Sequence, residues 1–119
     1  MKNVGMFTLF NGTAVLATEN LDSPVFNVRD YPCNGSFAIW VEETGDGTAK
    51  YTYQVSWDRI NFITPSGASD IVTAFIKATG TSGVDYYRFA PGPAPYLRIN
   101  VEETGDADDL APVATLLFD

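Results

Sequence analysis

The sequence of 119 residues contains no histidine and a single cysteine. Without histidine, the chain lacks the side chain that titrates nearest to neutral pH and that most often binds transition metals. Catalytic triads and dyads that use histidine are therefore excluded within this chain. Cys33 cannot form an intramolecular disulfide, and no adjacent base activates its thiol, so we interpret it as an ordinary loop residue.

Basic residues and long apolar runs are also scarce. Only seven Lys and Arg accompany fifteen Asp and Glu, which gives a net charge of −8. Such a surface repels phosphate backbones, so nucleic acid is not expected as a partner. No segment approaches the roughly 20 apolar residues of a membrane helix, and the first residues do not form an export signal. We expect a protein made in the cytoplasm and not inserted in a membrane.

Enzymatic activity is not expected either. A glycosidase uses a pair of carboxylates for catalysis and aromatic side chains to bind the sugar. The chain contains residues of both kinds, with fifteen Asp and Glu, eight Phe, six Tyr and two Trp. Such an enzyme needs a deep cleft, which a domain of this length can scarcely enclose. The sequence therefore predicts neither catalytic residues nor a cofactor.

Apolar residues recur with period two along several short segments, which indicates β-strands. In residues 36–43 the apolar side chains Phe37, Ile39 and Val41 share one face, and Trp40 lies on the other. In residues 50–57 the pattern places Tyr51, Tyr53, Val55 and Trp57 on the inner face. Further strands are predicted at 71–77, 84–90, 96–103 and 112–118.

Turn signals separate the strands of the first half. Asn11-Gly12, Asn34-Gly35 and Asp46-Gly47 favour the positive φ angles of tight turns, so each predicts a β-hairpin. The prolines of residues 90–95 cannot donate ladder hydrogen bonds, so this segment is expected to cross between strands or sheets.

The whole chain, 1–119, is predicted to be one all-β domain. Its expected form is an antiparallel two-sheet β-sandwich, jelly-roll-like, of about eight strands, with a closed barrel as the alternative.

An acidic motif occurs twice, as IWVEETGD at 39–46 and INVEETGD at 99–106. One interpretation is a Ca²⁺ site, because carboxylate oxygens are the ligands that Ca²⁺ prefers. However, neither copy has the spacing of a dedicated calcium loop, and consecutive residues of a strand point to opposite faces. We therefore expect solvent-exposed acids that keep sheet edges soluble, and no metal. The weak metal candidates are Glu42, Glu43, Asp46, Glu102, Glu103 and Asp106.

The N-terminal segment is strongly apolar. Residues 1–10 include Met6, Phe7, Leu9 and Phe10, which are too apolar for a free tail. They form either a docking segment for another protein or an edge strand of this domain's own core. Pairing through the turn at Asn11-Gly12 favours the second interpretation.

Two stretches carry a resemblance to a known class of proteins. TENLDSPVFNVRDYPCNGSFAIWVEETGDGTAKYTYQVSWDRINF and YYRFAPGPAPYLRINVEETG resemble small β-sandwich accessory virion proteins, such as capsid decoration proteins, of tailed bacteriophages and prophages. Arg59 and Phe62 depart from a pattern with Gly and Trp at these two positions. The resemblance implies a non-enzymatic structural role in a virion, with homo-oligomerisation and contacts to other virion proteins.

A carbohydrate-binding module is the alternative function. Such modules stack aromatic rings on sugars, and Trp40, Tyr86 and Tyr96 could supply these rings. The same three residues suit a protein interface, where Tyr and Trp are enriched. The interface candidates are therefore Met6, Phe7, Leu9, Phe10, Trp40, Tyr86 and Tyr96.

Overall fold

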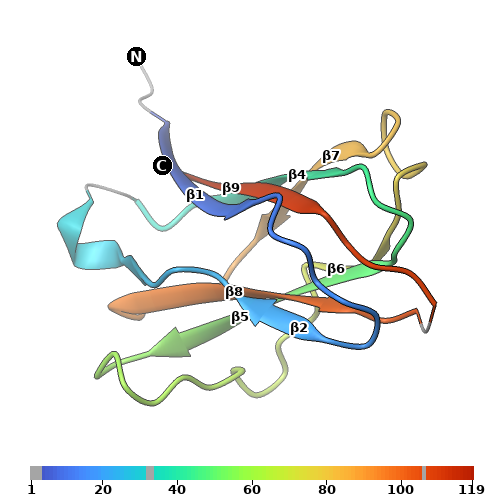
Figure 1. Ribbon diagram of the computed structural model, residues 1–119. Helices are drawn as coiled ribbons and strands as arrows, with labels where there is room; N and C mark the ends of the chain where they lie inside the picture. The colour runs from blue at the N-terminus through green and yellow to red at the C-terminus, as the bar shows by residue number, and fades with distance from the viewer. Residues whose placement is uncertain (1–3, 32–33, 106) are drawn as a thin grey trace.

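A computed structural model describes residues 4–31, 34–105 and 107–119, which form two antiparallel β-sheets packed face to face (Figure 1). One sheet has the strand order β1-β9-β4-β7 and the other β2-β8-β5-β6, with β3 paired to β8 beside β2. The elements are β1 Gly5–Asn11, β2 Asn20–Asp22, β3 Phe26–Asn27, the 3₁₀ turn η1 Val28–Asp30, β4 Phe37–Glu43, β5 Ala49–Ser56, β6 Val72–Phe75, β7 Val84–Phe89, β8 Tyr96–Glu103 and β9 Pro112–Phe118.

Most connections cross from one sheet to the other, which is the arrangement of a jelly roll. The first and last long strands, β1 and β9, lie side by side, and β2 and β3 together occupy one strand position beside β8. The proline-containing segment 90–95 joins β7 to β8 in the opposite sheet, as its composition predicted. The predicted two-sheet antiparallel sandwich is therefore confirmed. Within the described ranges, no helix has the length and apolar character needed to span a membrane.

The core lies between the two sheets and follows the period-two pattern. Ile39 and Val41 of β4 face Ile99 and Val101 of β8 across the interior, and all four are fully buried. Burying a side chain of this size contributes about 1.5–3 kcal/mol. An aromatic cluster closes one end of the core, where Phe26 contacts the rings of Phe7, Tyr31, Phe37 and Phe118.

The three predicted hairpins are wrong. Gly12 and Gly35 do adopt positive φ angles of 83° and 88°, but the strands before and after them do not pair with each other. After Asn11-Gly12 the chain leaves the sheet, because β1 pairs with β9. Residues 44–48, with Asp46-Gly47, connect β4 to β5 in the opposite sheet. The turn chemistry was recognised correctly, but it does not specify which strands pair.

Residues 5–11 form the edge strand β1, which sends three apolar side chains into the core, and residues 1–3 of the predicted segment lie outside the described residues. Leu9 and Phe10 are buried and Phe7 packs against the core, so these three side chains are not available to a partner. Met6 points outward and is 74% exposed. The docking hypothesis is therefore wrong for Phe7, Leu9 and Phe10.

The inward assignment of Trp57 is also wrong. Strand β5 ends at Ser56, and the side chain of Trp57 is 84% exposed in the loop that follows. The period-two pattern extends only as far as the strand does.

We expect Phe10→Ala to lower the free energy of unfolding by about 3–5 kcal/mol, because it leaves a cavity between the sheets. Met6→Ala, four residues earlier in the same strand, should change it by less than about 0.5 kcal/mol, because Met6 is exposed. Urea unfolding of both variants measures the difference. Equal losses would show that β1 does not have one inward and one outward face.

A buried hydroxyl in β5 makes stability sensitive to alkaline pH. Burial, and then the charge of Glu43, raise the pKa of Tyr51 above its usual value of about 10. The neutral phenol is favoured in the folded state, so this contribution is present below pH about 10 and is lost as the pH rises above it.

Tyr51→Phe should therefore unfold less readily than the wild type above pH 10. At neutral pH it should be as stable or slightly more stable, since the hydroxyl has no hydrogen-bond partner among the described residues. Urea unfolding across this pH range, with the exposed Tyr86→Phe as control, measures the effect. A large loss at neutral pH would contradict this account.

Candidate functional site

The candidate site is the solvent-facing side of the β1-β9-β4-β7 sheet, here called the outer face. Strand register places the side chains in rows across the four strands. One row runs Thr8, Thr115, Trp40 and Tyr86, and the next runs Met6, Leu117, Ala38 and Arg88. Three interface candidates from distant parts of the sequence, Met6, Trp40 and Tyr86, therefore share one surface.

The outer face combines exposed apolar area with little charge. Trp40 is 44% exposed and Tyr86 is 47% exposed, and the two are directly opposite on β4 and β7. Its charged side chains among the described residues include Arg88 beside Ala38, Glu42 near the far end of β4, and Asp119, which lines a hollow of about 180 Å³ with Tyr86 and Arg88. Exposed Met, Trp and Tyr with an arginine are the composition that distinguishes protein interfaces from the remaining surface. The central strands β9 and β4 fix this surface, because each is paired on both sides.

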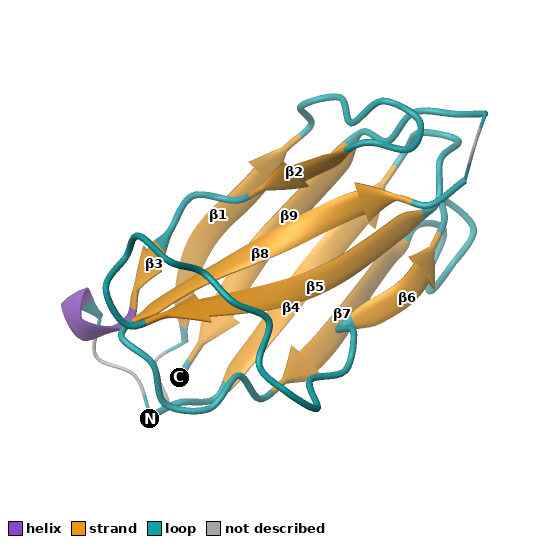
Figure 2. Cartoon of the chain, turned by 90° about the horizontal axis from the view of Figure 1, so that it is seen from below, coloured by secondary structure: helices purple, strands orange, loops and turns teal. Residues whose placement is uncertain are grey.

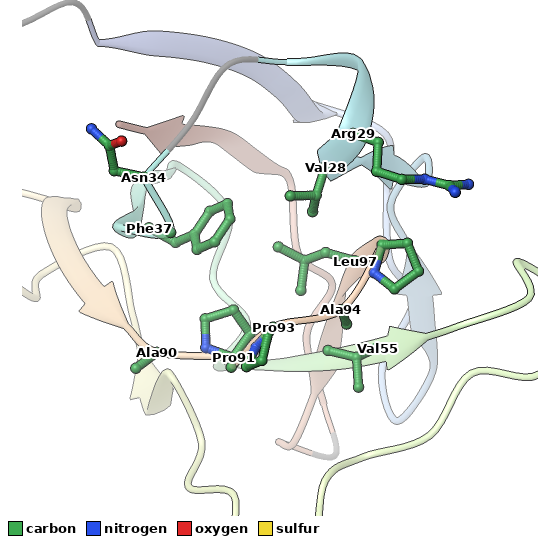
Figure 3. A pocket seen from close by; sticks show the side chains of 13 residues that line it. Val28, Arg29, Asn34, Phe37, Val55, Ala90, Pro91, Pro93, Ala94 and Leu97 are labelled. Carbon is green, nitrogen blue, oxygen red and sulfur yellow. The ribbon is translucent and has the colours of Figure 1, made fainter.

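A pocket of about 730 Å³ opens between the sheets at the end of the sandwich where η1 lies (Figure 3). Its walls are mostly apolar and come from Phe37, Val55, Leu97 and the connector 90–95. Arg29 is the one charged residue among the described residues that line it, and its guanidinium points away from the cavity. The described residues that line the pocket include neither a pair of carboxylates nor a row of aromatic rings, which are the parts expected of a glycosidase or a sugar subsite.

Tyr96 does not belong to the outer face. It lies at the start of β8 in the opposite sheet, where its hydroxyl accepts a hydrogen bond of 2.7 Å from Nη2 of Arg29. From the sequence, Trp40, Tyr86 and Tyr96 were equivalent candidates. In the structure, Tyr96 lies on a different sheet from Trp40 and Tyr86.

The acidic repeat has a different role from the one expected. Glu43 and Glu103, the second Glu of each copy, are 2% and 1% exposed, so the expectation of solvent-exposed acids is wrong for both. Each continues the inward face of its strand, two residues after Val41 or Val101. Glu42 and Glu102 are partly exposed, and Asp46 is exposed as expected.

The two buried carboxylates hold the loops that follow the strands. Oε2 of Glu43 accepts hydrogen bonds from the backbone N–H of Gly45, at 2.7 Å, and of Ala111, at 2.9 Å. Oε2 of Glu103 accepts one of 2.6 Å from the N–H of Thr48, which precedes β5. The carboxylate of one copy of the motif thus contacts the chain next to the other copy.

Gly45 of the first copy and Gly47, directly after it, leave room for this arrangement. A Cβ atom on Gly45 would lie 2.9 Å from Oε2 of Glu43, and one on Gly47 would lie 3.0 Å from Oε2 of Glu103. Both would also lie 2.9 Å from the carbonyl oxygen of Asp109. The second Glu of each copy and the glycines beside it are therefore explained by local packing and backbone hydrogen bonds.

Metal ligation was the alternative interpretation of the motif. Among the described residues, no group of three or more His, Cys, Asp or Glu side chains could hold a metal ion. Asp106, one of the weak candidates, and Cys33 lie outside the described residues. Oε1 of Glu43 and Oη of Tyr51 are both buried without a hydrogen-bond partner in the described part of the chain.

Comparisons with known proteins identify no family. No family model matches the sequence, and no curated protein matches it. Among solved structures, the chain is similar to the "Structure of infectious bursal disease virus Gx strain", with a TM-score of 0.43 and 9% sequence identity. That match covers 97% of this chain and 31% of the viral chain.

We expect Glu103→Ala to lower the free energy of unfolding by about 1–3 kcal/mol, because it removes the acceptor of a buried backbone N–H. Glu102→Ala is the matched control. The side chain of Glu102 is partly exposed, so its removal should lower the free energy of unfolding by less than about 0.5 kcal/mol. Thermal or urea unfolding of both variants measures the difference. If both substitutions lowered the free energy of unfolding by the same small amount, the structural role of the buried carboxylate would be contradicted.

Proposed function

We propose that this chain is a non-enzymatic structural protein of a bacteriophage virion, a capsid decoration or other accessory head or tail protein. The resemblance of residues 18–62 and 86–105 to such proteins supports this proposal. The observation that carries it in the structure is the outer face, where Met6, Trp40 and Tyr86 are exposed together. An accessory virion protein acts by occupying a surface, which requires a rigid domain with a complementary face.

The outer face is well suited to contacts with another protein. Its side chains project from a paired β-sheet, so little conformational entropy is lost when they are buried by a partner. Trp and Tyr are also the residues that most often dominate binding energy at protein interfaces. Under this proposal the partner covers Trp40 and Tyr86, and Arg88 lies at the rim.

The proposal is tested in the phage or prophage that encodes the chain. The protein should be present in purified particles, and the double variant Trp40→Ser/Tyr86→Ser should fold but be lost from them. Thr52→Ala is the matched control, because Thr52 lies on β5 of the opposite sheet, and it should be incorporated normally. Quantitative mass spectrometry of the particles measures incorporation, and circular dichroism checks folding.

Two results would contradict the proposal at different points. Absence of the wild-type chain from particles would contradict the virion role. Normal incorporation of the double variant would contradict the assignment of the outer face.

Carbohydrate binding is the second candidate, and one observation favours it. Trp40 and Tyr86 are directly opposite each other on β4 and β7, with Thr115 opposite Trp40 on β9 and Arg88 two residues along β7, and exposed aromatic side chains so placed can stack on sugar rings. A glycan array and a pull-down on insoluble polysaccharide would detect this activity. Binding that is abolished by Trp40→Ser would support it, and a negative result in both assays would remove it.

A further inference from the structure

Each sheet ends in edge strands, whose backbone N–H and C=O groups on one side are not used within the sheet. Figure 2 shows β1 at one edge of the β1-β9-β4-β7 sheet and β7 at the other. In the second sheet the edges are β6 and the position shared by β2 and β3. Proteins usually protect such edges, because an open edge pairs readily with another strand.

Three of these four edges carry features that discourage pairing. At β7, the N–H of Tyr86 donates a hydrogen bond of 2.8 Å to Oδ1 of Asp85, and the carbonyl oxygen of Val84 accepts one of 2.9 Å from Thr81. β2 and β3 have three and two residues, and the segment between them contains Pro24. β6 has four residues. Short, interrupted or internally bonded edges offer few groups to an incoming strand.

β1 has none of these features. It is seven residues long and contains neither a proline nor a charged side chain. The uncharged stretch is longer than the strand, since residues 3–18 of the sequence include no Asp, Glu, Lys or Arg. In a chain of net charge −8, this is an edge at which two acidic molecules can meet without placing like charges together.

The hydrogen bonds of β9 show which side each of its residues faces. The N–H of Asp119 donates to Ser36, which continues the line of β4, and the carbonyl oxygen of Pro112 accepts from Gly12, which continues the line of β1. Backbone groups alternate between the two sides of an antiparallel strand. The even-numbered residues of β9 therefore bond to β1, and the odd-numbered residues bond to β4.

This alternation identifies the outward groups of β1. Phe7 is opposite Leu116, so its backbone groups face β9. The N–H and C=O groups of Met6 and Thr8 consequently point to the open side, away from β9. The side chain of Met6 is 74% exposed, and that of Val4, just before the strand, is 58% exposed. Open hydrogen-bonding groups and exposed apolar side chains thus occur in the same short stretch.

Close packing fixes this edge in the strand conformation. A Cβ atom on Gly5 would lie 2.2 Å from ring atoms of Phe118, so the backbone at the start of β1 lies directly against that ring. Leu9 and Phe10 are buried farther along the strand. An edge anchored at both ends loses little conformational entropy when it pairs with another strand.

We propose that two copies of the chain pair through their β1 strands, antiparallel, about a two-fold axis at Met6. In this register Met6 lies opposite Met6 of the second copy, and Thr8 lies opposite Val4. Each outward N–H then meets an outward C=O, because two identical strands related by a two-fold axis present the same pattern to each other. The exposed side chains of Met6 and Val4 are removed from water on both copies.

A second copy fits this edge better than the other strand edges of the same protein do. Pairing β1 with β7 of another molecule would break the hydrogen bond between Tyr86 and Asp85. The contact between two β1 strands breaks no described hydrogen bond, covers both open edges at once and ends at a dimer. Two-fold dimers are also the commonest symmetric assemblies of soluble proteins.

The dimer goes beyond the proposed virion role and does not depend on it. It joins two four-stranded sheets into one, so Trp40 and Tyr86 of both copies lie on the same side of the joined sheet. Absence of the chain from virus particles would leave dimerisation of the purified chain unaffected. A monomeric chain would still be able to enter particles through its outer face, so the two proposals fail separately.

Sedimentation velocity of the purified full chain over a range of concentrations tests the proposal. We expect a dimer with a dissociation constant on the order of 10 µM, because one strand edge makes a small interface. Added salt should not weaken the dimer, since the contact contains no ion pair and the two copies carry net charge of the same sign.

Substitutions of Met6 test the contact at its centre. Met6→Pro removes an outward N–H and leaves the hydrogen bonds to β9 in place, so it should weaken association by at least about tenfold. Met6→Lys places two like charges directly opposite each other and should have an effect of similar size. Met6→Ala keeps the N–H and adds no charge, so it is the matched control and should weaken association by less than about threefold. Circular dichroism of each variant checks folding.

A disulfide tests the register. In a Cys33→Ser background, Met6→Cys should form a covalent dimer on mild oxidation, because directly opposite residues of an antiparallel pair lie within disulfide range. Tyr86→Cys in the same background is the matched control on the other edge strand, and it should remain monomeric under denaturing electrophoresis without reductant.

Four results would overturn the proposal. One is a wild-type chain that stays monomeric up to about 1 mM. Another is a dimer that Met6→Pro and Met6→Lys leave unchanged, and a third is a covalent dimer formed through Tyr86→Cys but not through Met6→Cys. The fourth is a monomeric chain whose Met6→Pro variant is lost from virus particles, which would assign the edge to a strand of another virion protein.

Discussion

Two buried carboxylates hold the chain together at the end of the sandwich where β4 and β8 finish, away from η1 (Figure 2). Glu43 ends β4 and accepts the N–H of Ala111, just before β9, and Glu103 ends β8 and accepts the N–H of Thr48, just before β5. Each bond joins the end of one strand to the start of a neighbouring strand in the same sheet. A buried carboxylate is tolerated only when such donors replace water, so the glycines that let the loops approach are part of the same requirement.

The strands could be predicted from the sequence, but their partners could not. Period-two alternation located β4, β5, β7, β8 and β9 within a residue or two of their ends, because burial on one face of a sheet leaves a strong local pattern. Pairing is a different matter. Asn11-Gly12 has the composition of a hairpin turn, yet the energy that selects β9 as the partner of β1 comes from the core between the sheets, between residues far apart in the chain.

Part of the candidate site was also accessible from the sequence. The outward position of Trp40 follows from its alternation with Ile39 and Val41, but its proximity to Tyr86 and Met6 depends on the order β1-β9-β4-β7. The sequence also indicated the burial of Glu43 and Glu103, although we did not predict it. Each lies two residues beyond an inward Val, so the pattern that placed the valines in the core applied equally to the carboxylates.

Burial of apolar area is the physical property by which the outer face would hold a partner. Its apolar and aromatic side chains project from neighbouring paired strands, so affinity there comes from area removed from water and depends weakly on salt. The jelly roll separates this face from the loops at the ends of the strands. The strands carry the outward side chains, while Glu43 and Glu103 hold loops from the buried side through backbone hydrogen bonds.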